Sequence, residues 1–341
     1  MKNNVFTFIF ISLLIFGYNN TIVAQAAESV EITGKLAQKF AAGITEADLK
    51  THLYIIASDE FEGRNTGEPG QKMAAEYIKD FYITRNIASP LGENNYFQTI
   101  SSEHLSRNLK PSENVVAFIK GSEKPDEIVV ISAHYDHLGM DKDGEIYNGA
   151  DDDGSGTVAV MAIAEAFHKA VEDGNGPKRS ILFLHVTGEE KGLLGSKYYV
   201  NFPIFPLENT VVDLNIDMIG RTDSAHENNP NYIYLIGSDK LSTELHHLSE
   251  EMNDKFTHLN LDYTYNLDSD PNRFYYRSDH YNFAKNNIPV IFYFNGTHEN
   301  YHRISDTPDK INYELLAKRA KLVFYTAWEI ANREKRISVD K

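Results

Sequence analysis

The 341-residue sequence contains no cysteine, and its 33 Lys and Arg residues are outnumbered by 49 Asp and Glu residues. The absence of cysteine excludes disulfides, thiolate metal sites and a lipid-modified cysteine. The formal net charge of -16 argues against nucleic acid as a partner, because phosphate binding requires a basic face. We find no internal repeat, no low-complexity linker and no like-charge run long enough to form an interaction tail. A hydrophobic content of 42% is nevertheless ample for a packed core.

The N-terminal segment has the pattern of a secretory signal peptide. Lys2 precedes an apolar run at residues 5–17, which is too short to span a bilayer comfortably, and Ala24-Gln25-Ala26 forms an A-x-A cleavage site. A buried helix or a membrane anchor is the alternative. The sequence predicts cleavage after Ala26 and an exported protein, periplasmic or secreted, with no membrane anchor after cleavage.

Apolar runs rich in β-branched residues alternate with helical patterns further along the chain. This alternation predicts an α/β fold with a mixed, mostly parallel central sheet and helices on both faces. The expected strands are 114–119, 127–133, 180–187, 211–216, 232–236 and 289–294. The expected helices are 70–82, 155–170, 194–201, 242–253 and 313–332, and Thr307-Pro308-Asp309 predicts a turn or helix start before the last of them.

Residues 148–157, NGADDDGSGT, place three carboxylates side by side between glycines. Asp and Gly are typical turn residues, so a solvated acidic turn is one interpretation. A divalent cation is the other, because it converts the mutual repulsion of the carboxylates into shared attraction. The D-x-[DN]-x-[DN]-G spacing of an EF-hand is missing.

Further polar residues directly follow three of the expected strands. His134 and Asp136 follow 127–133, and the pair Glu189 and Glu190 follows 180–187. Asp217 follows 211–216. Ligands of open α/β sheets bind outside the carboxyl ends of the strands, so we expect these residues at one edge of the sheet.

Metal chemistry gives these residue types possible roles, although each has an ordinary alternative. A carboxylate two residues from His134 could fix its second ring nitrogen. Adjacent glutamates at a strand end could divide the tasks of metal ligand and proton acceptor, or they could simply be solvated. Asp217 interrupts an apolar run and could be a ligand or the partner of Arg221 in a buried ion pair. His302 lies in a loop after the last expected strand and could be an ordinary surface residue.

The series AHYDH, GADDDGSGT, TGEEKGLLGS, NIDMIGR and YHRISDTPDKI resembles the co-catalytic di-zinc aminopeptidases of peptidase family M28. This family includes secreted bacterial leucyl aminopeptidases and is related to the glutamate carboxypeptidase-like enzymes. Residues 57–67 resemble the family's entry segment, and residues 277–280 resemble its S-D-[HY] stretch. The resemblance implies a zinc exopeptidase fold with a single catalytic domain at 49–335. Residues 27–48 would then be a lead-in, and 336–341 a C-terminal tail.

The resemblance also implies a role for each site residue. Asp152 would bridge two zinc ions, with Co²⁺ or Mn²⁺ as possible substitutes. The remaining ligands would be His134 and Asp217 for one ion and Glu190 and His302 for the other. Glu189 would be the general base, Asp136 would orient His134, Asp151 and Asp153 would support the ligands or form the turn, and Tyr301 matches a tyrosine that steadies the oxyanion in some relatives. The implied substrates are peptides with a free N-terminus.

Two other functions are compatible with the same fold. Glutaminyl-peptide cyclases share the fold and use one zinc, and an exported metal-binding protein could keep the fold without catalysis. The complete set of five ligands favours two metals, and the presence of Glu189 favours catalysis. Loops 223–231 and 267–276 are expected to shape the specificity pocket. No oligomeric state follows from the sequence.

Overall fold

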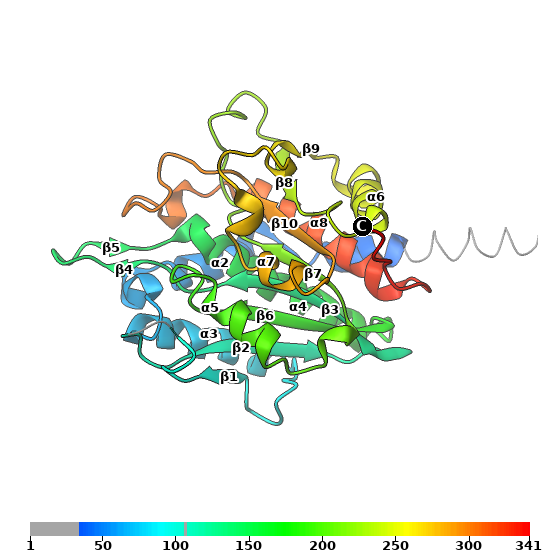
Figure 1. Ribbon diagram of the computed structural model, residues 1–341, viewed down its shortest axis with the longest axis horizontal. Coiled ribbons are helices and arrows are strands. Elements are labelled where there is room, and N and C mark those ends of the chain that lie inside the picture. Colours follow the sequence, from blue (N-terminus) through cyan, green and yellow to red (C-terminus); the bar gives the residue numbers. More distant parts are fainter. Residues whose placement is uncertain (1–33, 106–107) are drawn as a thin grey trace, which may run out of the picture.

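The computed structural model describes residues 34–105 and 108–341. An eight-stranded sheet with the order β1-β2-β6-β3-β7-β10-β8-β9 crosses the molecule, and β4 and β5 form a separate pair (Figure 1). The strands are β1 Phe97–Ile100, β2 Ser112–Ile119, β3 Lys124–His134, β4 Gly139–Met140, β5 Ile146–Tyr147, β6 Arg179–Val186, β7 Thr210–Ile216, β8 Tyr232–Ile236, β9 Asn260–Asp262 and β10 Val290–Phe294.

The four central strands, β6, β3, β7 and β10, are parallel to one another. Strands β2 and β8 flank them in antiparallel pairings, and β1 is antiparallel to β2 whereas β9 is parallel to β8. β6 and β7 are buried along their whole length, and β3 is buried over its second half. Continuous burial is expected of parallel strands covered on both faces, and it explains their runs of Val, Ile and Leu.

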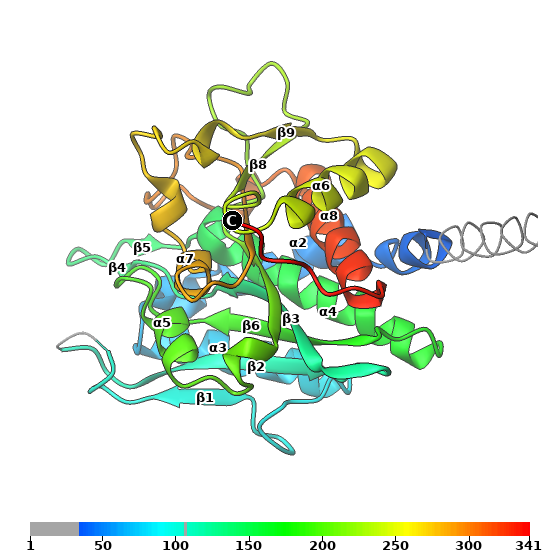
Figure 2. The same cartoon turned by 45° about the vertical axis from the view of Figure 1, so that its right-hand side comes forward.

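Helices cover both faces of the sheet (Figure 2). The α-helices are α2 Glu46–Ile56, α3 Pro69–Thr84, α4 Gly156–Glu172, α5 Leu194–Asn201, α6 Thr243–Met252, α7 His280–Ala284 and α8 Tyr313–Asn332. The shorter turns are η1 Asp59–Arg64, η2 Ala150–Ser155, η3 Leu207–Asn209, η4 Asn253–Thr257, η5 Thr264–Asn266, η6 Phe274–Tyr276 and η7 Pro308–Lys310. The larger core lies between the sheet and α2, α3, α4, α6 and α8, whereas α5 and α7 cover the opposite face with a smaller core.

Side-chain caps fix the start of three of these helices. Thr45 accepts from the backbone N–H of Asp48 at α2, Ser242 caps α6, and Asn312 caps α8. The Thr307-Pro308 pair begins only the single turn η7, so α8 starts at its own cap five residues later. Capping oxygens satisfy backbone N–H groups that have no partner inside the helix, and therefore define where each helix begins.

The predicted mixed, mostly parallel sheet with helices on both faces is confirmed. All six expected strands and all five expected helices are present, with ends that shift by three residues or fewer. The sequence did not predict β1, β4, β5, β9, α2 or α7. The predicted signal peptide at 1–26, and residues 27–33 of the lead-in, lie outside the described residues. Within the described part of the chain, no helix combines the length and apolar character needed to cross a membrane.

Candidate metal centre

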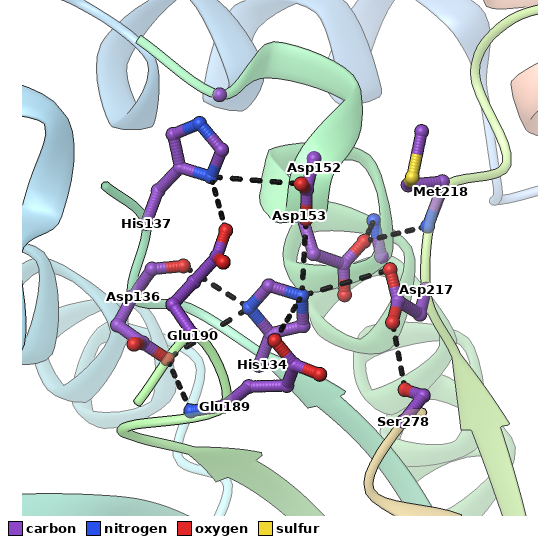
Figure 3. A network of polar contacts seen from close by, with 12 residues as sticks. His134, Asp136, His137, Asp152, Asp153, Glu189, Glu190, Asp217, Met218 and Ser278 are labelled. Atoms are coloured by element: carbon purple, nitrogen blue, oxygen red, sulfur yellow. Dashed lines mark hydrogen bonds and ion pairs between the residues drawn. The ribbon is translucent and has the colours of Figure 1, made fainter. Parts of the chain in front are cut away.

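Most candidate site residues lie at or just after the carboxyl ends of the central parallel strands. His134 is the last residue of β3, and Asp217 directly follows β7. Glu189 and Glu190 follow β6 after two intervening residues. Asp152 comes from η2, which connects the β5 region to α4. The predicted gathering at one sheet edge is therefore observed, and Figure 3 shows these side chains converging.

Asp152 stands between two clusters of side chains. Its Oδ1 lies 3.2 Å from His134 Nε2, which in turn lies 3.6 Å from Asp217 Oδ1. Its Oδ2 lies 3.0 Å from His302 Nε2 and 3.8 Å from His137 Nδ1. One carboxylate thus offers one oxygen to each cluster, which is the arrangement a bridging ligand requires.

Glu190 completes the second cluster. Its Oε2 lies 3.4 Å from His302 Nε2, and its Oε1 lies 2.9 Å from His137 Nδ1. Within the described residues, groups of donors close enough to share one ion include His134 with Asp152 and Asp217, and His137 with Asp152 and Glu190. The sequence did not predict His137.

Buried donor atoms of both clusters lack hydrogen-bond partners among the described residues. They are His134 Nε2, both ring nitrogens of His137, Asp152 Oδ2 and Glu190 Oε1. Buried polar atoms are normally paired, because leaving one unpaired costs about 1–3 kcal/mol. Imidazole and carboxylate donors without thiolate suit zinc. The residues therefore fit two zinc ions sharing Asp152.

The tautomer of His134 is fixed by the backbone carbonyl of Asp136. The backbone carbonyl of Asp136 lies 3.0 Å from His134 Nδ1 and can only accept, so Nδ1 carries the proton and Nε2 is free as a donor to metal. The carboxylate of Asp136 lies farther away, 3.8 Å from Nδ1. It accepts instead from Thr66 Oγ1 at 2.7 Å and from the backbone N–H of Glu189 at 3.1 Å. The carboxylate of Asp136 thus positions the backbone of the predicted base.

The three consecutive aspartates do not form a solvated turn, because all of them are buried. Asp151 points away from the clusters, accepting from Gly220 N–H at 2.7 Å and lying 3.1 Å from His298 Nε2. Asp153 accepts from the backbone N–H groups of Gly156 and Met218 at 2.8 Å and 3.0 Å. Only the middle aspartate faces both clusters.

Two further residues hold this segment in place, and neither was assigned a role from the sequence. Asp306 accepts from the backbone N–H groups of Asp151 and Asp152. Arg64, fully buried at the end of η1, donates to the backbone carbonyls of Ile56, Tyr135, Asn148 and Gly149. Residues 57–67 therefore support the metal centre, because Arg64 links the end of β3 to the start of η2 through hydrogen bonds.

Burial and close charges shift the pKa values of the cluster. Burial alone would lower the pKa of His134, but the carboxylates of Asp217 and Glu189 raise it well above its usual value. Burial would raise the pKa of Asp152, but His134 and His302 hold it well below its usual range. Burial raises the pKa of Glu189 well above its usual value. A bound dication would be the largest local charge and would reset these balances.

A cavity opens beside Asp152, Glu189 and Asp217. Its other lining residues are Met218, Phe274, Arg277, Phe292, Phe294, Thr297 and Tyr301. Phe274 belongs to the predicted specificity loop 267–276, whereas Asp223, from the other predicted loop, is buried in hydrogen bonds with Tyr234 and His226. Tyr301 stacks on His302 with ring centroids 3.8 Å apart. Glu189 thus faces both the first cluster, at 4.0 Å from His134 Nε2, and the cavity.

Asp217 does not form the alternative ion pair with Arg221. Its Oδ2 accepts from Ser278 Oγ at 2.7 Å, and Arg221 donates to Asn300 Oδ1 at 2.9 Å. Ser278 belongs to the segment 277–280 singled out in the sequence. The hydroxyl donor fixes one oxygen of Asp217 and leaves the other directed at His134.

Several curated proteins are similar in sequence. "Leucine aminopeptidase 2" of Trichophyton rubrum is 26% identical over 270 residues, covering 72% of this chain and 50% of that protein. "Leupeptin-inactivating enzyme 1" of Streptomyces exfoliatus is 26% identical over 308 residues, covering 83% of this chain and 61% of that protein. A "Probable zinc metalloprotease" of Pyricularia oryzae is also 26% identical, over 57% of its length. The chain thus spans about half the length of the curated relatives it matches.

Solved structures share the fold. LapA aminopeptidase of Legionella pneumophila superposes with a TM-score of 0.68 at 21% identity, covering 88% of this chain and 74% of that one. BSAP, a zinc aminopeptidase of Bacillus subtilis, gives a TM-score of 0.65 at 16% identity, covering 86% of this chain and 96% of that one. The family model described as "Peptidase family M28" matches residues 114–327, more than half of the chain. The span that matches holds every residue of the two clusters, and the chain belongs to peptidase family M28.

Proposed function

We propose that the chain is an exported zinc aminopeptidase that hydrolyses the first peptide bond of substrates with a free N-terminus. The observation that carries this proposal is the position of Asp152, with one oxygen directed at each of two histidine and carboxylate clusters. Glu189 beside the first cluster and the cavity supports catalysis.

In this proposal, His134, Asp152 and Asp217 would hold one zinc ion, and Asp152, Glu190 and His302 would hold the other. Bound zinc would polarise the scissile carbonyl and lower the pKa of water towards neutrality. Glu189 then takes a proton from the water whose oxygen attacks the carbonyl carbon. When the C–N bond breaks, Glu189 gives that proton to the leaving amine nitrogen, so the carboxylate is regenerated. Tyr301, on the cavity wall, would donate to the carbonyl oxygen as negative charge develops on it.

Two features support hydrolysis over the single-zinc cyclase and the non-catalytic alternatives. Both clusters offer complete donor sets that share Asp152, so the site fits two ions rather than one. Glu189 is present, and its carboxylate has no ligand role in either donor set. A protein that only stored metal would have no need for a buried carboxylate between the donors and a cavity.

Substituting Glu189→Gln removes the proton acceptor while keeping its shape. We expect the variant to retain two zinc ions per chain and to lose about 10²- to 10⁴-fold in turnover, the usual contribution of a general base. Zinc is counted by mass spectrometry after the excess is removed, and turnover is measured with leucine and glutamate p-nitroanilides, because the cavity combines apolar walls with Arg277.

The matched control is Glu145→Gln, at an exposed glutamate outside the site. It should keep both zinc ions and full turnover. Wild-type turnover in the Glu189→Gln variant would refute the mechanism. One zinc per chain together with cyclisation of N-terminal glutamine would favour the cyclase, and two zinc ions without turnover on any aminoacyl substrate would favour a non-catalytic protein.

Export is proposed from the N-terminal pattern. Cells producing the full chain should release or hold in the periplasm a protein whose first residue is Ala27, as determined by N-terminal sequencing. Leu14→Arg interrupts the apolar run and should leave an unprocessed precursor in the cytoplasm. A mature protein that still begins at Met1 would contradict the proposed cleavage.

A further inference from the structure

His137 is a buried histidine for which neither the sequence nor the proposed mechanism has a role. Its side chain is fully inaccessible, and neither ring nitrogen has a hydrogen-bond partner among the described residues. Burying ring nitrogens without hydrogen bonds is costly, and Nδ1 instead faces the carboxylates of Glu190 and Asp152, which are themselves candidate metal ligands. Figure 3 shows the ring directed at Glu190 and Asp152.

His137 Nδ1 adds a fourth donor beside Asp152, Glu190 and His302, because both imidazoles face the same two carboxylates. His137 Nδ1 lies 2.9 Å from Glu190 Oε1 and 3.8 Å from Asp152 Oδ2. His302 Nε2 lies 3.0 Å from Asp152 Oδ2 and 3.4 Å from Glu190 Oε2. Tetrahedral ligands at zinc bond lengths of about 2.0–2.1 Å are separated from one another by about 3.3 Å. The four nitrogen–oxygen separations range from 2.9 Å to 3.8 Å and so lie on both sides of this value.

The surrounding backbone holds the ring in this orientation. The N–H of His137 donates to the carbonyl of Arg64 at 3.1 Å, and His137 forms a β-bridge with Asn65. On the other side the ring lies against Gly149, where an added Cβ would come within 2.5 Å of Cγ and Cδ2. Gly149 in turn accepts a hydrogen bond from Arg64 at 2.8 Å. The imidazole therefore sits in a slot that only a glycine leaves open.

We propose that His137 Nδ1 is a direct ligand of the cation held by Asp152, Glu190 and His302. This position then has four protein donors, whereas the position of His134 has three, namely His134, Asp152 and Asp217. Four protein donors are typical of closed structural zinc sites, and three with an open position are typical of catalytic ones. The two positions would differ in task, one anchoring its ion and the other admitting water and substrate. The inference rests on the proposed function only in assuming zinc.

Zinc binding to the protein with His137 intact provides a test that requires no substitution in the metal centre. The mature chain is freed of metal and loaded with one and then two equivalents of zinc, and X-ray absorption counts the imidazoles per ion. With one equivalent in the four-donor position we expect two imidazoles per zinc, from His137 and His302. Adding the second equivalent, bound by His134 alone among histidines, should lower the average to about one and a half. One imidazole per ion at both stages would overturn the inference.

The variant His137→Phe keeps a planar ring and removes both nitrogens. Competition with a chromophoric chelator should show two zinc steps in the wild type and a loss of at least about 10-fold in affinity for the tighter step in the variant. The matched control is His185→Phe, a fully buried histidine on β6 that faces Tyr82 and lies outside the donor groups. The control should leave both steps within twofold, and equal behaviour of the two variants would refute the ligand role.

One confounding site must be removed first. His246, His247 and Glu250 on α6 form a third donor group that is partly exposed and could take up zinc. All measurements are therefore made in a His247→Ala background. A protein that binds no zinc in this background would contradict the proposed function itself, whereas two bound ions with one imidazole each would contradict only the role of His137.

Discussion

Gly149 illustrates how a single residue permits the donor arrangement. Its backbone is left-handed, with φ of 55°, at the start of η2. An added Cβ would approach the carbonyl oxygen of Asp152 to 2.3 Å and the ring of His137 to 2.5 Å. Both neighbours are proposed ligands, so a side chain at this position would displace the two donors together.

We expect Gly149→Ala to lose both stability and zinc. The left-handed backbone alone costs an alanine about 1–2 kcal/mol, and the two contacts add to that cost. Gly144→Ala is a matched control, because Gly144 also has a positive φ, of 85°, but an added Cβ there would meet no atom within 4 Å. Urea unfolding in the presence of a chelator should give the highest free energy of unfolding for the wild type, a lower one for Gly144→Ala and the lowest for Gly149→Ala. Only Gly149→Ala should bind less zinc. Equal stability of the two variants would contradict this account.

Residue chemistry and position predicted much of the candidate site from the sequence. His134, Asp152 and Asp217 are buried, Glu190 is partly buried, and the four lie together because each follows a parallel strand or lies in the acidic segment. His137 was missed because it stands three residues beyond the last strand residue, His134, where strand alternation no longer says which way a side chain points. The bridge to Asn65 turns it back to the site, and no pattern in the sequence indicates that pairing.

At the level of elements, the predicted helices and strands are those whose patterns are long and local. The buried strands β3, β6 and β7 contain runs of branched apolar residues, and α8 has an apolar stripe over five turns. The unpredicted elements are mostly short. β1 and β9 have four and three residues at the sheet edges, and α7 has five. Their formation depends on partners distant in the sequence, which local patterns do not contain.

Helix α2 was missed for a different reason. It has eleven residues and a Thr45 cap, but it lies across the predicted boundary between the lead-in and the catalytic domain at residue 49. Its buried Leu49, Leu53 and Ile56 belong to the main core, and Ile56 supplies a carbonyl to Arg64. The helix therefore contributes directly to the support of the metal centre. The domain boundaries themselves stay a prediction.

At the scale of the whole molecule, acid stability depends on histidines that the fold keeps neutral. Burial lowers the pKa of His185 to about 3. In the unfolded chain its pKa is about 6.5, so protons bind preferentially to the unfolded state as the pH falls below 6.5. His185 alone should thus remove about 1.4 kcal/mol of unfolding free energy for each pH unit between 6.5 and 3. Asp279 acts in the opposite sense, because burial raises its pKa to about 7, and its contribution to stability is lost as the pH rises through that value.

The variant His185→Phe isolates the first effect. Urea titrations from pH 7 to pH 4 measure the free energy of unfolding of both proteins. Below pH 6.5 the wild type should lose about 1.4 kcal/mol per pH unit relative to the variant. Asp279 contributes equally to both proteins and cancels. Parallel curves over this range would mean that His185 can accept a proton in the folded state.

The sharing of Asp152 also constrains how such a site can change during descent. Any substitution at Asp152 takes a donor from both cations at once, so it offers no gradual route from two ions to one. Asp217, Glu190 and His137 each serve a single cluster. We therefore expect a descendant that binds only one ion to have lost one of these unshared donors and to have kept Asp152. The acidic segment would then persist after the second ion is no longer bound.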